Sequence, residues 1–109
     1  MKYYNTPVDY DGHQFDSKAE RDRYIELKLM QDMGVISGLE LQKTFVLQPK
    51  GRYPSGKAYS AITYIADFVY FIGDEAVVED VKGFRTREYM MKKKMMAKVY
   101  NIEIQEVKA

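Results

Sequence analysis

The stretch that decides the fold is AITYIADFVYFIGDEAVVEDVKG, residues 61–83. It contains two apolar runs, at 61–71 and 75–82, whose length and composition are typical of β-strands. Gly73 and Asp74 between them have the composition of a two-residue hairpin turn with glycine at the first central position. The stretch therefore predicts an antiparallel hairpin whose register can be counted outward from the turn.

Charged residues lie inside both predicted strands, where ionised groups are costly to bury. Counting outward from the turn places Asp67 directly opposite Asp80, with their Cβ atoms about 5 Å apart. Lys82 shares the face of Asp80 because side chains alternate along a strand. By the same alternation Glu79 and Val81 point to the other face, so a structural or surface role is expected for Glu79. Two adjacent carboxylates repel each other unless a cation lies between them, and a divalent metal ion is the simplest such cation.

Length and composition restrict the class of protein. The 109 residues are expected to form one domain, 1–109, with an irregular or short extended arm at 1–16 and a core at 17–107. The absence of Cys excludes disulfides and thiolate zinc sites, and the lone His13 is expected to have no chemical role, so oxygen atoms would hold any metal ion. No stretch is suited to span a membrane and Met1–Asn5 lacks the apolar core of a signal peptide, so a cytoplasmic protein is expected.

The net charge of +1 conceals an uneven distribution along the chain. Residues 82–98 contain seven Lys or Arg residues and a single acidic residue, Glu88, so this segment carries about +6 and the remainder about −5. Such a segment can bind an anionic polymer, although a run of charge is more often a solvated helix face. The charge pattern alone does not decide between these two interpretations.

The rest of the sequence predicts a helix before the hairpin and a further helix and strand after it. Ser17 is a helix N-cap and Gly34 a stop signal, which together predict a helix at 17–33. The other expected elements are a strand at 44–48, a loop at 49–60, a helix at 86–100 and a strictly alternating strand at 102–107. The fold class is therefore α/β, an α+β arrangement with a mixed sheet in the order α-β-β-β-α-β, because a β-α-β connection favours a parallel final strand.

Asp67 followed by Asp80-Val81-Lys82 resembles the Asp…(Asp/Glu)-x-Lys signature of the PD-(D/E)xK nuclease superfamily. The resemblance covers nearly the whole domain, since the predicted order of elements matches the restriction-endonuclease-like core of that superfamily. It departs from the motif at Ala66, where the motif has Pro, and at Asp80, where many members have Glu. Within the superfamily the chain resembles a little-characterised phage and prophage family related to phage Holliday-junction-resolving endonucleases.

The resemblance implies a metal-dependent phosphodiesterase, an endonuclease that cuts DNA. Asp67, Asp80 and the backbone carbonyl of Val81 would hold one or two Mg²⁺ or Mn²⁺ ions, for which oxygen ligands are suited. A metal-bound water would attack the phosphorus in line, and Lys82 would orient or help deprotonate that water. The implied substrate is branched or junction DNA in phage recombination or replication, inside the host bacterium. A homodimer is implied because resolving enzymes cut two strands symmetrically.

Two polar residues near the predicted site have alternative roles. Glu20 stands three residues after Ser17, so its side chain could reach back to the Ser17 amide in a capping box. Helical spacing also allows it to point toward the sheet, and in the resolving endonucleases that this chain resembles a Glu on the first helix completes the metal site. Gln42 either lines the site or makes a surface hydrogen bond. The sequence leaves both pairs of alternatives open.

Basic residues that follow Lys82 are expected to contact phosphates of the nucleic acid rather than base edges. These residues are Arg85, Arg87, Lys92 and Lys93. No Asn or Gln is grouped among them, so cleavage should depend on the shape of the DNA more than on its sequence. The competing class is a module that keeps the fold to bind nucleic acid or a phage protein without turnover, but such a module has no reason to retain buried charges.

Overall fold

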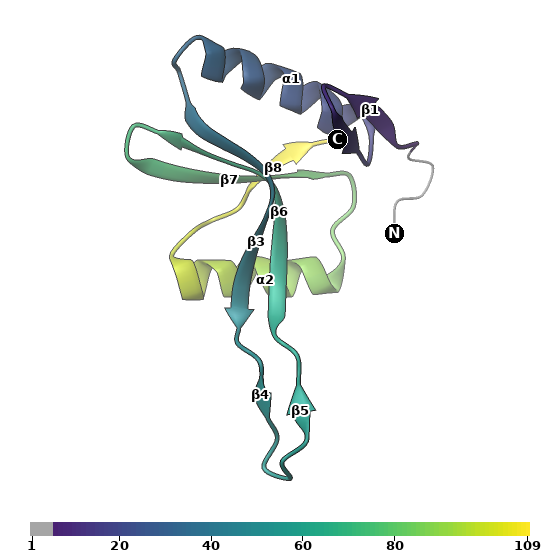
Figure 1. Ribbon diagram of the computed structural model, residues 1–109, viewed down its shortest axis with the longest axis vertical. Coiled ribbons are helices and arrows are strands. Elements are labelled where there is room, and N and C mark those ends of the chain that lie inside the picture. Colours follow the sequence, from purple (N-terminus) through teal and green to yellow (C-terminus); the bar gives the residue numbers. More distant parts are fainter. Residues whose placement is uncertain (1–5) are drawn as a thin grey trace.

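A computed structural model describes residues 6–109, in which a four-stranded sheet lies between two helices (Figure 1). The main elements are α1 (Lys18–Asp32), β3 (Ser37–Gln48), β6 (Ile62–Ile72), β7 (Glu75–Lys82), α2 (Arg87–Tyr100) and β8 (Gln105–Lys108). The sheet has the order β3-β6-β7-β8, with antiparallel pairs except for the parallel pair of β7 and β8. The prediction of a mixed α/β protein with a mixed sheet and two helices is confirmed.

β6 and β7 form the hairpin predicted at the centre of the sequence. Gly73 has a φ of 59°, a conformation that glycine adopts without steric cost and that this turn requires. The observed register pairs Phe68 with Glu79, as counting from the turn predicted. The backbone ladder ends at this pair. Asp67 and Asp80 therefore follow at the point where the two strands cease to pair.

Two separate clusters of buried side chains hold the helices on the sheet. The cluster beneath α2 contains Phe45, Leu47, Tyr64, Ala66, Val69, Val78, Tyr89, Met96 and Ile104. The cluster beneath α1 contains Phe15, Tyr24, Leu27, Ile36, Phe68, Tyr70 and Val81. Ala66 and Val69 of β6 belong to the first cluster and Phe68 to the second, so the regular alternation of faces along β6 shifts by one residue at Asp67.

The predicted arm at residues 1–16 contains a short hairpin packed against α1. β1 (Val8–Tyr10) pairs antiparallel with β2 (His13–Phe15). Phe15 is almost completely buried in the cluster beneath α1, so the aromatic end of β2 anchors this hairpin to the core. Residues 1–5 of the predicted arm lie outside the described residues.

β3 is longer than the strand predicted at 44–48, because it begins at Ser37. Gly38 and Gln42 have positive φ values of 64° and 53°, and the pairing with β6 is irregular between Ser37 and Glu40. These interruptions remove the alternation of apolar and polar residues by which a strand is recognised in a sequence. The final strand is shorter than predicted, because Ile104 packs beneath α2 before the ladder of β8 begins.

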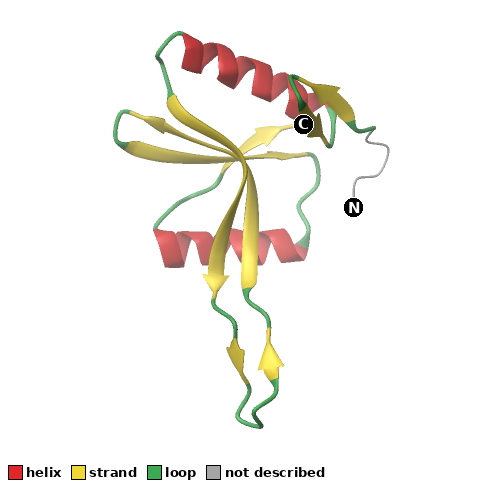
Figure 2. Ribbon diagram, viewed as in Figure 1, coloured by secondary structure: helices red, strands yellow, loops and turns green. Residues whose placement is uncertain are grey.

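A second short hairpin projects beyond the sheet where the sequence predicted a loop at 49–60. β4 (Gly51–Arg52) pairs antiparallel with β5 (Ala58–Tyr59), and both continue the direction of β3 and β6 away from the helices (Figure 2). The chain is consequently elongated, with extents of 53 × 37 × 23 Å. Its radius of gyration is 15.8 Å, against about 13 Å for a compact chain of this length.

Candidate functional site

Three buried carboxyl groups meet where the pairing of β6 and β7 ends. Asp67 on β6, Asp80 on β7 and Glu20 on α1 are 8%, 4% and 3% exposed. The side chain of Asp67 makes hydrogen-bonding contacts with both other carboxyl groups. The structure thus brings together the three acidic residues that the sequence analysis assigned to the site.

Asp67 is held in place by its neighbours on both sides. The backbone N–H of Val81 donates to Asp67 Oδ2 at 2.8 Å, so this amide bonds to a side chain instead of continuing the ladder. On the opposite side, Gln42 Nε2 donates to Asp67 Oδ1 at 3.3 Å. Gln42 carries the positive φ described above, which costs energy for a residue other than glycine. Of its two interpretations, the structure shows the one in which Gln42 lines the site.

Asp80 has two partners on the side of the sheet that faces α2. The hydroxyl of Tyr64 donates to Asp80 Oδ2 at 2.6 Å, and Lys82 Nζ lies 3.5 Å from the same oxygen. The Lys82 ammonium also lies 4.0 Å from the centroid of the Tyr89 ring, a cation–π contact. Lys82 and Asp80 therefore share a face, as predicted. Tyr64 was not predicted as a site residue, and the signal in the sequence was a tyrosine in a buried strand whose hydroxyl needs a partner.

The carboxyl groups of Asp67 and Asp80 have raised pKa values because they are buried beside one another. Burial raises the pKa of Asp80 to about 7, and contact with Asp67 adds to this effect, while the Tyr64 hydroxyl and the Lys82 ammonium oppose it. Burial also raises the pKa of Asp67, and the charge of Glu20 contributes to that increase. A group of carboxyls in this state retains protons near neutral pH unless a cation replaces them.

The donor set fits Mg²⁺ or Mn²⁺ in chemical kind, since these cations prefer carboxylate and carbonyl oxygens. Asp67, Asp80, Glu20 and the Val81 carbonyl are the groups that would hold an ion. As the side chains stand, the carboxyls contact one another, and within residues 6–109 no three His, Cys, Asp or Glu side chains already surround a metal position. Metal binding would therefore have to separate the carboxyls and release protons from them.

Glu79 points to the opposite face, as predicted, but it is buried and not on the surface. It is 3% exposed and forms a bidentate ion pair with Arg23 of α1, with Nε–Oε1 and Nη2–Oε2 distances of 2.8 and 2.6 Å. The Tyr70 hydroxyl also donates to Glu79. This ion pair fastens α1, which carries Glu20, to β7, which carries Asp80.

The predicted phosphate-binding residues lie on and before α2, and most are paired with carboxylates. Arg85 and Lys93 bind the two oxygens of Glu106 at 2.8 and 2.9 Å, which joins α2 to β8. Lys92 pairs with an acidic residue one turn earlier, at 3.6 Å, and Arg87 is exposed at the start of the helix. Contact with phosphate would require Arg85 and Lys93 to exchange Glu106 for the nucleic acid, and this role stays a prediction.

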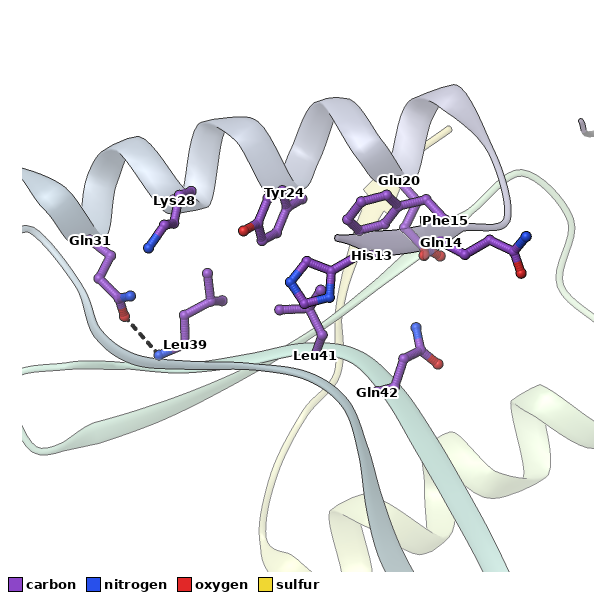
Figure 3. Close-up of a pocket in the computed structure, with 10 residues that line it drawn as sticks. All are labelled: His13, Gln14, Phe15, Glu20, Tyr24, Lys28, Gln31, Leu39, Leu41 and Gln42. Atoms are coloured by element: carbon purple, nitrogen blue, oxygen red, sulfur yellow. Dashed lines mark hydrogen bonds between the residues drawn. The ribbon is translucent and has the colours of Figure 1, made fainter. Parts of the chain in front are cut away.

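A cavity of about 500 Å³ lies between α1, the β1–β2 hairpin and β3. Glu20 and Gln42, which both contact Asp67, line one end of it (Figure 3). His13 lines the same cavity, with its ring centroid 5.3 Å from that of Tyr24. The cavity thus gives solvent-sized molecules a route toward the carboxyl groups, and it places the only histidine closer to the site than the sequence indicated.

Substitutions of Ser17 and Glu20 distinguish the two roles proposed for the first turn of α1. Ser17 Oγ accepts the Glu20 N–H at 3.2 Å, so Ser17→Ala should lower the free energy of unfolding by about 1 kcal/mol and leave Mn²⁺ affinity unchanged. Glu20→Gln should lower Mn²⁺ affinity, because one anionic ligand is lost. Urea denaturation and metal titration of both variants test this. A Glu20→Gln variant that is less stable but binds Mn²⁺ normally would leave Glu20 with a capping role alone.

The metal-free protein should lose stability as the pH rises from about 4 to about 7. Asp80 has a folded-state pKa of about 7 against an ordinary value of 3.8, so the folded state binds more protons in this interval. The contribution of protonated Asp80 to the free energy of unfolding is fully present below pH 4 and is lost as the pH rises through the folded pKa. This loss is on the order of 2 kcal/mol in total. Denaturation in EDTA at several pH values measures this, and Asp80→Asn should flatten the curve. Identical curves for both proteins would contradict the assignment.

The comparison with known proteins gives a family for the chain. No helix within residues 6–109 is both long and apolar enough to cross a membrane. A comparison with curated proteins gives no match. A family model described as "Protein of unknown function (DUF1064)" matches residues 1–108, which is nearly the entire sequence. The chain therefore belongs to the DUF1064 family.

Proposed function

We propose that the protein is a metal-dependent endonuclease that hydrolyses phosphodiester bonds in DNA. The observation that carries this proposal is the meeting of Glu20, Asp67 and Asp80 at the end of a strand pair, with Lys82 3.5 Å from Asp80. Buried carboxylates that need a cation, together with an adjacent ammonium, are the groups required for metal-assisted hydrolysis of a phosphodiester. The proposal includes a restriction-endonuclease-like core in the order α-β-β-β-α-β, formed by the main-sheet elements and the two helices.

A purely structural role explains the cluster less well. Three carboxyl groups face one lysine, so the cluster carries an excess of negative charge when it is ionised. Unbalanced buried charge destabilises a protein, and apolar residues of similar size would often serve the fold as well or better. Glu79 shows the contrast, since its carboxylate is fully matched by the Arg23 guanidinium on the other face of the same strand. The three carboxyl groups of Glu20, Asp67 and Asp80, called the acidic cluster below, therefore have the character of a functional site. The Arg23–Glu79 pair has the character of a structural contact.

Each residue of the cluster has a distinct task in the proposed reaction. Glu20, Asp67 and Asp80 would hold the ion, which would polarise the phosphoryl group and lower the pKa of water. Asp67 is kept in orientation by the Val81 amide. Lys82, held beside Asp80, orients the attacking water and takes part in its deprotonation. Site residues that are already fixed before substrate binds reduce the reorganisation needed in the transition state.

The proposed substrate is branched DNA, and a four-way junction is its most informative form. We expect Mg²⁺ or Mn²⁺ to support cutting of four-way DNA in preference to nicked or linear duplexes of the same sequence. Reactions in EDTA serve as the control. Equal cutting of linear DNA would show that the enzyme does not select junctions, and an absence of cutting in all reactions would remove the endonuclease proposal. Recombination or replication of phage DNA in the cytoplasm of a bacterial host is the proposed setting.

The alternative is a binding module that holds nucleic acid or a phage protein without turnover. The observation in its favour is the direct contact of the carboxyls, which are not spread around a metal position as they stand. Tight binding of four-way DNA that is independent of divalent ions, combined with an absence of cutting, would support this alternative.

The proposal also includes a homodimer, since a junction-cutting enzyme must cut two strands. Ile25 and Leu29 of α1 and Met33 at its C-cap follow one another at four-residue spacing and are 39%, 58% and 69% exposed. This spacing places them on one side of the helix, where a second copy would cover apolar area. Sedimentation equilibrium should show a dimer that Leu29→Glu converts to monomer. A monomeric wild-type protein over the working concentration range would contradict this part.

A further inference from the structure

We propose that the projecting hairpin, residues 49–61, binds duplex DNA about one helical turn away from the bond that is cut. These residues are called the basic hairpin below. The inference rests on the proposed function for the identity of the polymer, but it concerns a surface that lies outside the acidic cluster. It assigns a role to the segment that makes the chain elongated and that contributes no side chain to either core cluster.

The charge of the basic hairpin is exclusively positive. It carries Lys50, Arg52 and Lys57, and no acidic residue occurs between Glu40 and Asp67. The three cationic residues are exposed. On and before α2, by contrast, Arg85 and Lys93 are paired with Glu106, and Lys92 is paired with Glu88. The cations of the basic hairpin can therefore meet a phosphate backbone without first leaving a carboxylate partner, which Arg85, Lys92 and Lys93 cannot.

The basic hairpin has a defined internal structure although it lies outside the core. The rings of Tyr53 and Tyr59 pack edge to face across it, with centroids 5.1 Å apart. Tyr59 also covers Gly51 so closely that a Cβ atom there would collide with its hydroxyl end. The turn is closed by Tyr53 N–H donating to the Lys57 carbonyl at 2.8 Å, and Arg52 Nη1 donates to the Gly56 carbonyl at 2.8 Å. An isolated two-stranded hairpin gains little stability from burial, so these contacts maintain its shape for another purpose.

The position of the basic hairpin relative to the acidic cluster matches the repeat of B-DNA. β6 carries Asp67, and the nine residue intervals from Ala58 to Asp67 span about 30 Å at the rise of a β-strand. One helical turn of B-DNA is about 34 Å long. A two-stranded ribbon also fits the major groove, which is about 12 Å wide. A duplex arm with its scissile phosphate at Asp67 would therefore meet the hairpin about 10 base pairs away.

The experiment measures how affinity depends on the length of the duplex arms. Four-way DNA with arms of 8 or 20 base pairs is titrated in Ca²⁺, and binding is followed by fluorescence anisotropy. The wild type should bind the long-armed DNA about tenfold more tightly. Lys50→Ser/Lys57→Ser should lose this gain. The slope of log K against log salt concentration should also be smaller in magnitude by about 1.8 for this variant, which is the value for two lost phosphate contacts. Lys18→Ser/Lys28→Ser removes the same charge from one exposed and one half-buried position of α1 and should retain the gain.

Failure of this inference is distinguishable from failure of the proposed function. Equal affinity of the wild type for both arm lengths, or equal effects of the two double variants, would overturn the role of the basic hairpin whether or not the DNA is cut. The protein could bind long-armed DNA more tightly through the basic hairpin and yet cut no DNA in Mg²⁺. That result would support the inference and remove the endonuclease proposal. Cutting of short-armed DNA should be unchanged in the hairpin variant, since its changes lie roughly 20–30 Å from Asp67 along the strands.

Discussion

Replacing Asp67 by asparagine should reduce Mg²⁺-dependent cleavage of DNA by on the order of a thousandfold. Asp67 contacts both other carboxyl groups, so it is the residue through which the cluster is connected. Asparagine still offers one oxygen to the Val81 amide, which donates to Asp67 at 2.8 Å, and the local structure should therefore persist. It lacks the anionic oxygen that a divalent ion requires. Initial rates of cleavage at saturating Mg²⁺ measure the effect.

The matched control for this substitution is Asp74→Asn, on the same hairpin. Asp74 is exposed in the turn between β6 and β7, far along the strands from the acidic cluster, and asparagine suits such a turn. Its cleavage rate should equal that of the wild type. A rate for Asp67→Asn within tenfold of the wild type, with circular dichroism showing an unchanged fold, would contradict the assignment of Asp67 as a metal ligand.

Replacing Arg23 by alanine should lower the free energy of unfolding by about 3–5 kcal/mol. Glu79 is 3% exposed, and without the guanidinium its carboxylate would be left buried with the Tyr70 hydroxyl as its remaining polar contact among those described above. The bidentate bond with Glu79 also raises the pKa of Arg23. Urea denaturation at neutral pH measures the loss.

Arg21→Ala on the same helix is the control for this prediction. Arg21 pairs with Asp22 at 2.9 Å at the surface, and exposed ion pairs contribute less than about 1 kcal/mol. Replacing Arg23 and Glu79 together with methionine should recover much of the stability lost in Arg23→Ala, because no unpaired charge is then buried. Similar losses for Arg21→Ala and Arg23→Ala would show that the buried pair does not hold α1 on the sheet.

The central hairpin was predictable because its register depends on a two-residue turn and on nothing distant. Once Gly73 and Asp74 are recognised as the turn, the pairing of Phe68 with Glu79 follows by counting, and so does the approach of Asp67 to Asp80. The shared face of Asp80 and Lys82 followed from alternation in the same way. These features are local in sequence, which is why composition and spacing were sufficient.

The features that the sequence did not reveal depend on contacts between distant residues or on unusual backbone geometry. Arg23 and Glu79 are 56 positions apart, and nothing in either segment indicates that they meet. The start of β3 was missed because the left-handed φ of Gln42 breaks the pattern of the strand. The orientation of Glu20 was undetermined because a capping box and an inward-facing carboxylate use the same spacing.

The basic residues at 82–98 also have partners that the sequence did not reveal. Its positive charge is evident in the sequence, yet Arg85 and Lys93 find their carboxylate in Glu106, on the strand that follows α2. Glu106 is held there by the Tyr89 hydroxyl as well, which donates at 2.8 Å, and contact with Lys93 lowers the pKa of Glu106. A count of charges could not separate cations used within the fold from those of the basic hairpin, which are exposed on a projecting element.

Binding of Mn²⁺ is the most direct test of the acidic cluster as a metal site, because it does not depend on knowing the substrate. Isothermal titration at pH 7.5 in two buffers of different ionisation enthalpy measures both the number of ions bound and the protons released. The wild type and Asp74→Asn should each bind one or two ions with release of protons, and Asp67→Asn should lose this binding. The absence of saturable binding by the wild type, or equal binding by Asp67→Asn, would contradict the metal site.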